Sequence, residues 1–166
     1  MAAAQEHVID SPGAAVADPR IRAFGVLLTT ASLMERLLGA TMERESGISH
    51  AMFEVLLHLQ AAPEEGAMMS DLSRSLVLTS GGATRLVDRM VEAGLVSRSR
   101  SSQDKRVQLV SLTDAGREKL TEAAARHAAQ LDAHLYDVLP PGERDTMLQG
   151  LDDLGRHVRE VLPPLG

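Results

Sequence analysis

Residues 70–111 read SDLSRSLVLTSGGATRLVDRMVEAGLVSRSRSSQDKRVQLVS, and this stretch decides the fold. Its first half has the apolar spacing of two short helices joined by a turn. We expect Ser70 to cap the first helix, over 71–76, and Thr79 to cap the second, which Gly94 would end in a left-handed conformation. Two short helices in this order predict a helix-turn-helix.

The second half of the stretch has the alternating, β-branched character of strands. We expect these strands at 95–99 and 107–112, and the turn between them, 100–106, would be the tip of a wing. The predicted fold is therefore mostly α with a small β-hairpin wing. It is a winged helix-turn-helix with long dimerisation helices at both chain ends.

Charge separates this stretch from the remainder of the chain. Residues 70–111 hold seven basic and four acidic side chains, whereas the rest of the 166 residues holds ten basic and nineteen acidic ones. A pI of about 5.5 is by itself a poor indicator of a nucleic-acid partner. An acidic body that carries one basic module nevertheless keeps attraction to phosphate local, so the pattern favours DNA as the partner.

Helical periodicity flanks the basic stretch on both sides. The predicted helices are Pro19 to about Glu45, one capped by Ser49 that ends near Ala61, Thr113 to about Leu139, and Gly142 to Val161. Because the long helices carry more apolar surface than a module of this size needs, we expect a homodimer. The domains would be a flexible arm at 1–18, a winged helix-turn-helix at 49–112, and dimerisation helices at 19–48 and 113–166.

Composition excludes several classes of protein. The chain has no cysteine, which removes disulfides, thiolate metal sites and thiol-based redox sensing. The N-terminus lacks the basic start and apolar run of a signal peptide. No segment approaches the ~18–20 apolar residues that cross a bilayer. We therefore expect a soluble cytoplasmic protein with no membrane partner.

The second helix of the stretch is the candidate recognition helix. A recognition helix places its first residues at base edges in the major groove, and here these are Ser80, Gly81, Thr84 and Arg85. The two cap residues Ser70 and Thr79 are further candidate DNA contacts. The adjacent glycines cost about 1 kcal/mol each relative to alanine, and close approach of a phosphate backbone would account for them. Arg85 can donate two hydrogen bonds to a guanine, and Arg89 is better placed for phosphate. The alternatives are a loose helix start and a solvated face with pairs such as Arg85–Asp88.

The wing sequence RSRSSQDKR contains four basic residues and a single acid. Arg98, Lys105 and Arg106 are the candidate DNA contacts, because an arginine at a hairpin tip can enter a narrow minor groove. Phosphate would repel the Asp104 carboxylate, so we expect Asp104 to orient Arg106 or Arg98. A simple exposed turn is the alternative.

Three segments together resemble the MarR family of bacterial transcription regulators. They are DLSRSLVLTSGGATRLVDRMVEAGLVSR, the wing motif DKR, and LTDAGREKL at 112–120. The resemblance implies a homodimer with two winged helices that read a palindromic operator. By analogy Ser80, Thr84 and Arg85 read bases, Arg89 contacts phosphate, and Arg106 lies at the wing tip with Asp104 as its brace. It further implies a repressor released by a small, often aromatic or phenolic, anion.

That family's ligand usually binds between the dimer helices and the DNA-binding lobe. The candidate residues for such a pocket here are Phe24, Arg36, His50, Phe53 and His58. The favoured alternative is that the two phenylalanines are core residues and that His58 is a helix-surface residue. His127 and His134 lie two turns apart, about 10.5 Å along a helix, so one zinc ion could use both only with difficulty. We expect no metal or cofactor.

Two other functional classes compete with a DNA-binding regulator. An enzyme would need a nucleophile with a base, paired carboxylates or a metal cluster, and the sequence contains no such constellation; Gly81-Gly82 also lacks the lysine of a phosphate-binding loop. We therefore expect no enzymatic activity. The second alternative is a winged-helix protein–protein interaction module without DNA binding. The acidic net charge favours this alternative, whereas the cations of the helix and the wing, Arg85, Arg89, Lys105 and Arg106, argue against it.

Overall fold

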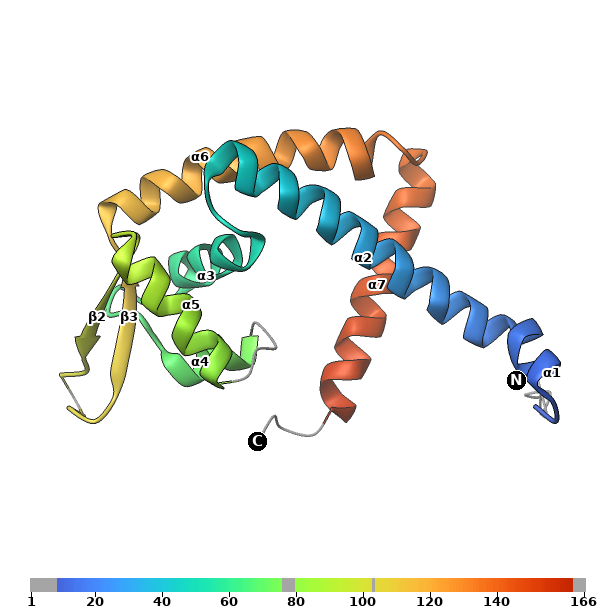
Figure 1. Cartoon of the computed structure of the whole chain (residues 1–166), viewed down its shortest axis with the longest axis horizontal. Helices are drawn as coiled ribbons and strands as arrows, with labels where there is room; N and C mark the ends of the chain where they lie inside the picture. The colour runs from blue at the N-terminus through green and yellow to red at the C-terminus, as the bar shows by residue number, and fades with distance from the viewer. Residues whose placement is uncertain (1–8, 76–79, 103, 163–166) are drawn as a thin grey trace.

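The computed structural model describes residues 9–75, 80–102 and 104–162 of the chain, and it is mostly helical (Figure 1). Its elements in chain order are α1 Pro12–Ala17, α2 Pro19–Ser46, α3 His50–Ala61, β1 Ala67–Met68, α4 Met69–Ser75, α5 Ser80–Glu92, β2 Val96–Arg100, β3 Gln108–Leu112, α6 Asp114–Leu131, the π-helical segment η1 Asp132–Tyr136, and α7 Pro141–Val161.

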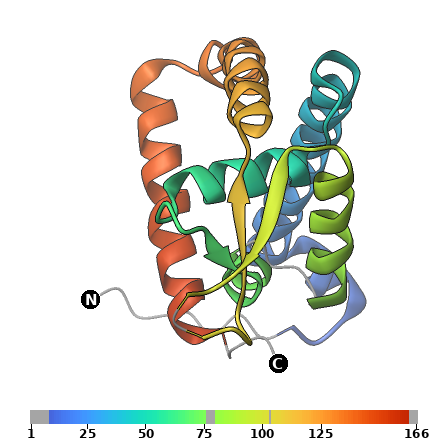
Figure 2. The same ribbon diagram turned by 90° about the vertical axis from the view of Figure 1, so that its left-hand side faces the viewer.

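The winged helix-turn-helix expected from the sequence is present. A three-stranded antiparallel sheet, in the order β1-β3-β2, lies beside α3, α4 and α5 (Figure 2). Gly94 has a φ of 72° directly after α5, as predicted for a left-handed helix end. The apolar core lies between these elements and includes the fully buried side chains of Val55, Leu56, Leu72, Val87 and Val110.

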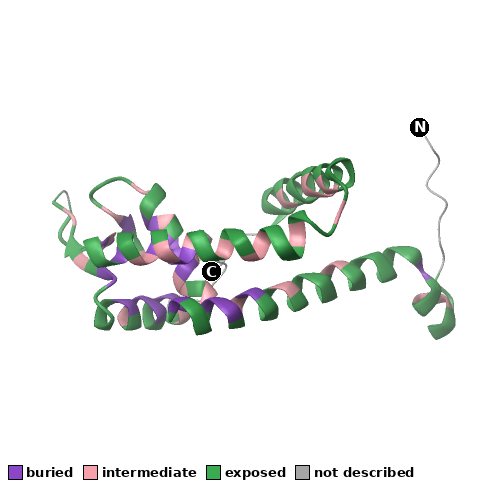
Figure 3. Cartoon of the chain, turned by 90° about the horizontal axis from the view of Figure 1, so that it is seen from above, coloured by how far each residue is buried: buried purple, intermediate pink, exposed green. Residues whose placement is uncertain are grey.

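The long helices extend away from this core. α2 and α6 lie side by side above the winged domain, and α7 descends from the far end of α6 (Figure 1). Only the C-terminal part of α2 is buried, at Leu38, Thr41, Met42 and Ser46, and no residue of α7 is buried (Figure 3). The single chain therefore leaves apolar side chains of both helices exposed.

Local sequence chemistry explains several helix boundaries. The Ser49 hydroxyl accepts from the backbone N–H of Met52 at 3.3 Å, and Thr113 Oγ1 accepts from that of Gly116 at 3.0 Å. Asp18 caps α2 and also binds the Arg20 guanidinium at 2.6 Å. Hydrogen bonds from the Arg20 side chain hold the pKa of this buried carboxyl well below its usual range.

Two expectations about helix bounds were wrong, and two elements were not predicted. The helix predicted from 71 begins at Met69, so Ser70 lies inside α4 instead of capping it. Residues 12–17 of the predicted flexible arm form α1, which Ser11 caps. β1 was not foreseen, because a two-residue strand has too few positions to show alternation. The helix expected to reach Leu139 changes to a π-helical turn at Asp132.

The expectation that no segment could cross a bilayer was also wrong. α2 is long and apolar enough by length and composition, although only 6% of its apolar window is buried. One such helix is weak evidence for a membrane span. An exposed apolar helix is equally what a dimerisation interface leaves in a single protomer.

Candidate nucleic-acid interface

The two faces of α5 differ sharply. Ala83, Leu86, Val87 and Met90 are buried against the core, whereas Thr84, Arg85 and Arg89 are exposed on the opposite side. This pattern follows from the i, i+3, i+4 spacing of the apolar residues. The helix therefore exposes Thr84, Arg85 and Arg89 to solvent.

The start of α5 carries the glycine pair. A Cβ built on Gly81 would meet nothing within 4 Å, so packing inside the protomer does not require a glycine there. Thr79 lies outside the described residues, and Ser80 is described only as the first residue of α5. Ser70, the remaining candidate in this region, is exposed in the first turn of α4.

A short set of hydrogen bonds shapes the wing turn. Asp104 Oδ1 accepts from the backbone N–H of Arg106 at 2.9 Å, and the Val107 N–H donates to the Asp104 carbonyl at 2.9 Å. The Ser101 N–H closes the turn by donating to the Val107 carbonyl at 3.0 Å. Asp104 thus braces the backbone at Arg106 rather than the guanidinium.

Arg98 differs from the other wing cations. Its Nη1 lies 2.7 Å from Asp88 Oδ1 on α5, and its Nε is buried without a hydrogen-bond partner among the described residues. The Arg85–Asp88 pair that the sequence offered as an alternative is not formed. Arg98 therefore joins the wing to the recognition helix, a contact between residues ten apart that helical spacing could not reveal.

The remaining cations are available to an external partner. Within the part of the chain that the structure describes, Arg85, Arg89, Lys105 and Arg106 are exposed and form no ion pair. Arg85 and Arg89 lie on α5, and Lys105 and Arg106 lie in the turn of the β2–β3 hairpin. Both elements belong to the winged domain (Figure 2). Unpaired positive charge on both elements suits the phosphates of a duplex.

The five candidate ligand residues do not form one site in the protomer. Phe24 and Arg36 are exposed on α2, and Phe24 is therefore not a core residue. Phe53 is buried, and its ring meets those of His50 and His127 at centroid distances of 6.4 and 5.2 Å. His58 lines a separate cavity beside the wing.

His50 and His127 belong to a small polar cluster where α2, α3 and α6 meet. His50 Nδ1 lies 2.8 Å from Glu35 Oε2, and its Nε2 lies 3.5 Å from Glu54 Oε1. Burial, together with the neighbouring His50, lowers the pKa of His127. Among the described residues no three acidic or histidine side chains are arranged to hold a metal ion.

This combination of a helix-turn-helix, a wing and an unpaired basic surface defines a winged-helix DNA-binding protein. Residues 46–107 match the family model described as MarR family. The chain is 36% identical over 128 residues to the HTH-type transcriptional regulator YdgJ of Bacillus subtilis, with 77% of this chain and 76% of YdgJ covered. The chain belongs to the MarR family of transcriptional regulators, a class of DNA-binding proteins rather than enzymes.

Two solved structures share the fold and include DNA. One is Sco3205, a MarR family transcriptional regulator from Streptomyces coelicolor in complex with DNA, with a TM-score of 0.76, 27% identity and 86% of each chain covered. The other is the transcriptional repressor CouR bound to a 23-mer DNA duplex, with a TM-score of 0.67, 28% identity, and 79% of this chain and 91% of CouR covered.

Proposed function

We propose that this regulator is a homodimeric repressor that binds a palindromic operator and is released by a small ligand. The unpaired cations on α5 and on the wing are the observation that carries the proposal. CouR, which is named a repressor, supports the sign of regulation. A regulator of chromosomal genes would act in the cytoplasm.

In the proposed complex α5 enters the major groove. Thr84 and Arg85 would contact base edges, and Gly81 and Ser80 would allow the start of the helix to approach the backbone. Arg89 would contact phosphate, and the wing would place Lys105 and Arg106 at the minor groove. Ser70 would contribute a polar contact to phosphate at the edge of the same surface, and Thr79, outside the described residues, stays a candidate contact from the sequence.

The proposed dimer forms through the helices at 19–48 and 113–166, on either side of the winged domain at 49–112. α2 exposes Ile21, Phe24 and Leu28, and α7 exposes Leu151, Leu154 and Val158. Exposed apolar area of this extent is unusual on a monomer. A two-fold dimer would cover it and hold two recognition helices at the ~34–36 Å separation of successive major grooves.

The proposed effector site lies where α2, α3 and α6 meet. His50 and Phe53 lie there, and Arg36 and Phe24 lie along α2, where the partner protomer could complete the pocket. An aromatic anion would suit the rings and the cations. Such a ligand lowers the affinity for DNA only if it binds more tightly to a dimer whose two recognition helices have a different separation from the one that fits DNA.

The test is fluorescence-anisotropy titration with DNA from beside the protein's own gene, over a salt series. Arg85→Ala and Arg106→Ala should each weaken binding, and Arg89→Ala, which removes the proposed phosphate contact, should reduce the salt slope by about 0.9. Arg44→Ala, which removes an exposed cation paired with Glu45 on α2, is the matched control and should bind normally. A folded dimer without selective binding at low salt would favour the protein-interaction alternative.

A further inference from the structure

The β2–β3 hairpin has one face that begins as core and ends as surface. Three cross-strand pairs share this face, in order from the base of the hairpin to its tip: Val96 with Leu112, Arg98 with Val110, and Arg100 with Gln108. Val96, Val110 and Leu112 are buried, so the face packs on the core at its base. Arg100 and Gln108 are both exposed, so packing does not cover the face near the tip.

Arg98 shows which way this face is turned. Its Nη1 lies 2.7 Å from Asp88 Oδ1, so the face is turned toward α5 at this level. Arg100 is two residues further along β2 on the same face, ~6.6 Å nearer to the tip. The hairpin and α5 diverge in that direction (Figure 1, Figure 2). Arg100 therefore lies beyond the core, on the side of the hairpin that is turned toward α5.

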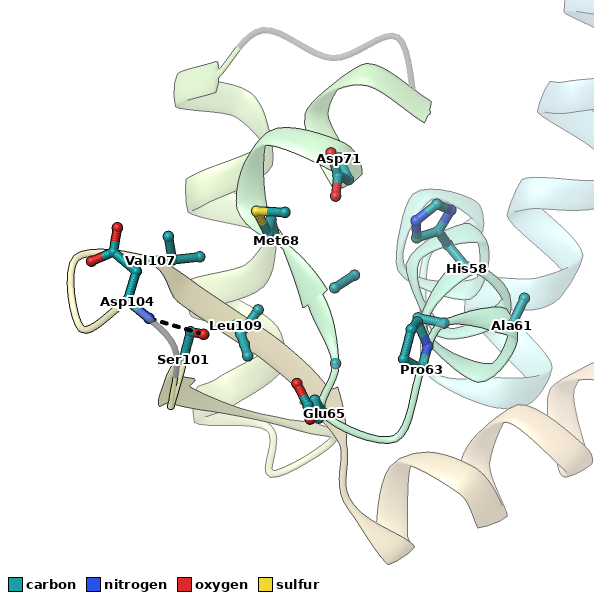
Figure 4. A pocket seen from close by; sticks show the side chains of 13 residues that line it. His58, Ala61, Pro63, Glu65, Met68, Asp71, Ser101, Asp104, Val107 and Leu109 are labelled. Carbon is teal, nitrogen blue, oxygen red and sulfur yellow. Dashed lines mark hydrogen bonds between the residues drawn. The ribbon is translucent and has the colours of Figure 1, made fainter.

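The opposite face of the hairpin has a different surface. Ser99 pairs with Leu109 on that face. Leu109 lines a cavity whose lining also includes Met68 and the carboxylates of Glu65 and Asp71 (Figure 4). Such a surface does not attract phosphate. Both cations of β2 are therefore on the face that is turned toward α5.

The two arginines of β2 differ in what they can bind. Asp88 already holds the Arg98 guanidinium. Within the described part of the chain, Arg100 has no acidic partner at ion-pair distance. Gln108, directly opposite, carries an amide with two further N–H donors. The exposed end of this face thus offers a cation and an amide to an acceptor outside the protomer.

Duplex geometry brings such an acceptor to this place in the proposed complex. A sugar–phosphate backbone separates each major groove from the minor groove beside it. With α5 in a major groove and the wing tip in the neighbouring minor groove, that backbone has to pass between α5 and the hairpin. Its phosphates would meet the face that carries Arg100 and Gln108.

We propose that Arg100 binds a phosphate of the DNA backbone that passes between α5 and the wing, and that the Gln108 amide donates to the same backbone. The contact fixes the position of the wing and the recognition helix on the duplex and reads no sequence. Arg100 thereby joins the DNA-binding residues, although the sequence assigned only Arg98, Lys105 and Arg106 of the wing to DNA. The proposal rests on the proposed function, since it requires binding to a duplex.

The test is fluorescence anisotropy with two duplexes, the fragment from beside the protein's own gene and a scrambled duplex of equal length and composition. Because a phosphate contact reads no sequence, Arg100→Ser should weaken binding to both. The slope of log affinity against log salt should fall by about 0.9 for each protomer that contacts DNA. For each such protomer, the ratio of variant to native dissociation constants should be about 3.5 times larger at ~50 mM than at ~200 mM salt. Arg100→Lys, which keeps the charge, should keep the slope.

A charge-matched swap separates position from charge. Ser99→Arg/Arg100→Ser keeps the composition and net charge of the chain but moves the arginine to the face of Leu109. It should bind as weakly as Arg100→Ser, with the same slope. Gln108→Ala removes an uncharged donor and should weaken binding about two- to tenfold without changing the slope. All these variants should keep the native Tm, because the substituted side chains are exposed.

Ethylation interference locates the phosphate. Ethylation of the phosphate that Arg100 contacts should weaken binding of the native protein and should leave binding of Arg100→Ser unchanged. This phosphate should lie between the guanine N7 atoms of the major groove and the adenine N3 atoms of the minor groove that the protein protects from dimethyl sulfate. The same interference pattern in both proteins would overturn the assignment.

The remaining outcomes separate this proposal from the proposed function. Native affinity in the swap variant would overturn the proposal, because net charge alone would then explain the effect of Arg100. A native slope in Arg100→Ser would overturn it as well. Equal affinity of the native protein for both duplexes would refute the selective regulator, while the slopes would still decide the role of Arg100. A folded dimer that binds neither duplex would overturn both.

Discussion

Gly81 gives the sharpest test of the recognition helix, because Gly81→Ala should move stability and DNA binding in opposite directions. Its Cβ would meet open space in the protomer, and the position lies in the first turn of α5 with a helical backbone. Alanine should therefore stabilise the fold by about 0.5–1 kcal/mol, mostly by restricting the unfolded chain. For a chain of this size that corresponds to a rise in Tm of about 1–4 °C.

The same methyl group should obstruct DNA. If the glycine allows a phosphate to approach the helix start, an added methyl group produces overpacking, which costs about 1–3 kcal/mol. The dissociation constant for the operator should then rise about 5- to 150-fold. Differential scanning calorimetry and fluorescence anisotropy at fixed salt measure the two effects on one sample.

A matched control separates this effect from helix propensity. Gly150 lies inside α7, where a Cβ would also meet nothing within 4 Å. Gly150→Ala should raise Tm by a similar amount and leave DNA affinity unchanged. If Gly81→Ala stabilises the protein and binds DNA as the native chain does, the glycine is not at a close approach, and our account of the helix start is refuted.

Three further predictions concern the contacts within the protomer. Arg98→Gln and Asp88→Asn should each destabilise the fold by about 1–2 kcal/mol, and a double-mutant cycle should show positive coupling; additive losses would mean that the pair does not join the wing to α5. Because the pKa of His127 is lowered in the native protein, the unfolded chain binds more protons than the native one below about pH 6.5, and the free energy of unfolding should fall on acidification through that range. The fall should be smaller in His127→Phe, with the facing groups His50, Glu35 and Glu54 left unchanged. Parallel pH profiles of the variant and the native protein would contradict the reasoning. Gly116→Ala would drive a Cβ into the Leu95 carbonyl and should destabilise the fold by several kcal/mol in urea unfolding, whereas near-native stability would show that α6 can shift.

Sequence reasoning predicted the elements whose signal is local. Ser49 is predicted as a cap because a hydroxyl three residues before a free N–H is a local pattern, and Thr113, predicted only to open its helix, forms the same hydrogen bond. Ser70 was misplaced by the same rule, since β1 continues directly into α4 at Met69 and leaves no extended residue for a cap. Two residues of strand pairing with β3 decided the boundary, and that pairing is not local.

The candidate site shows the same division. Exposure of Arg85 and Arg89 followed from the helical period of their apolar neighbours. The role of Arg98 could not be predicted in this way. Its partner Asp88 lies on α5 rather than β2, and the turn between these elements sets the distance between the two side chains. The sequence assigned Arg98, Lys105 and Arg106 alike to DNA, whereas tertiary packing gives Arg98 an internal partner.

The ligand candidates separate for a related physical reason. Aromatic and histidine side chains are too few in this chain to mark a pocket by composition, so the sequence could only collect them by type. Folding sends Phe53 into the core beside His50 and His127, leaves Phe24 on the exposed face of α2, and places His58 at an acidic cavity. In a single protomer the α2 residues Phe24 and Arg36 therefore lie on an open surface and do not enclose an aromatic anion. If such an effector exists, its affinity must depend on the second protomer, and effector binding should be lost on dilution below the dimer dissociation constant.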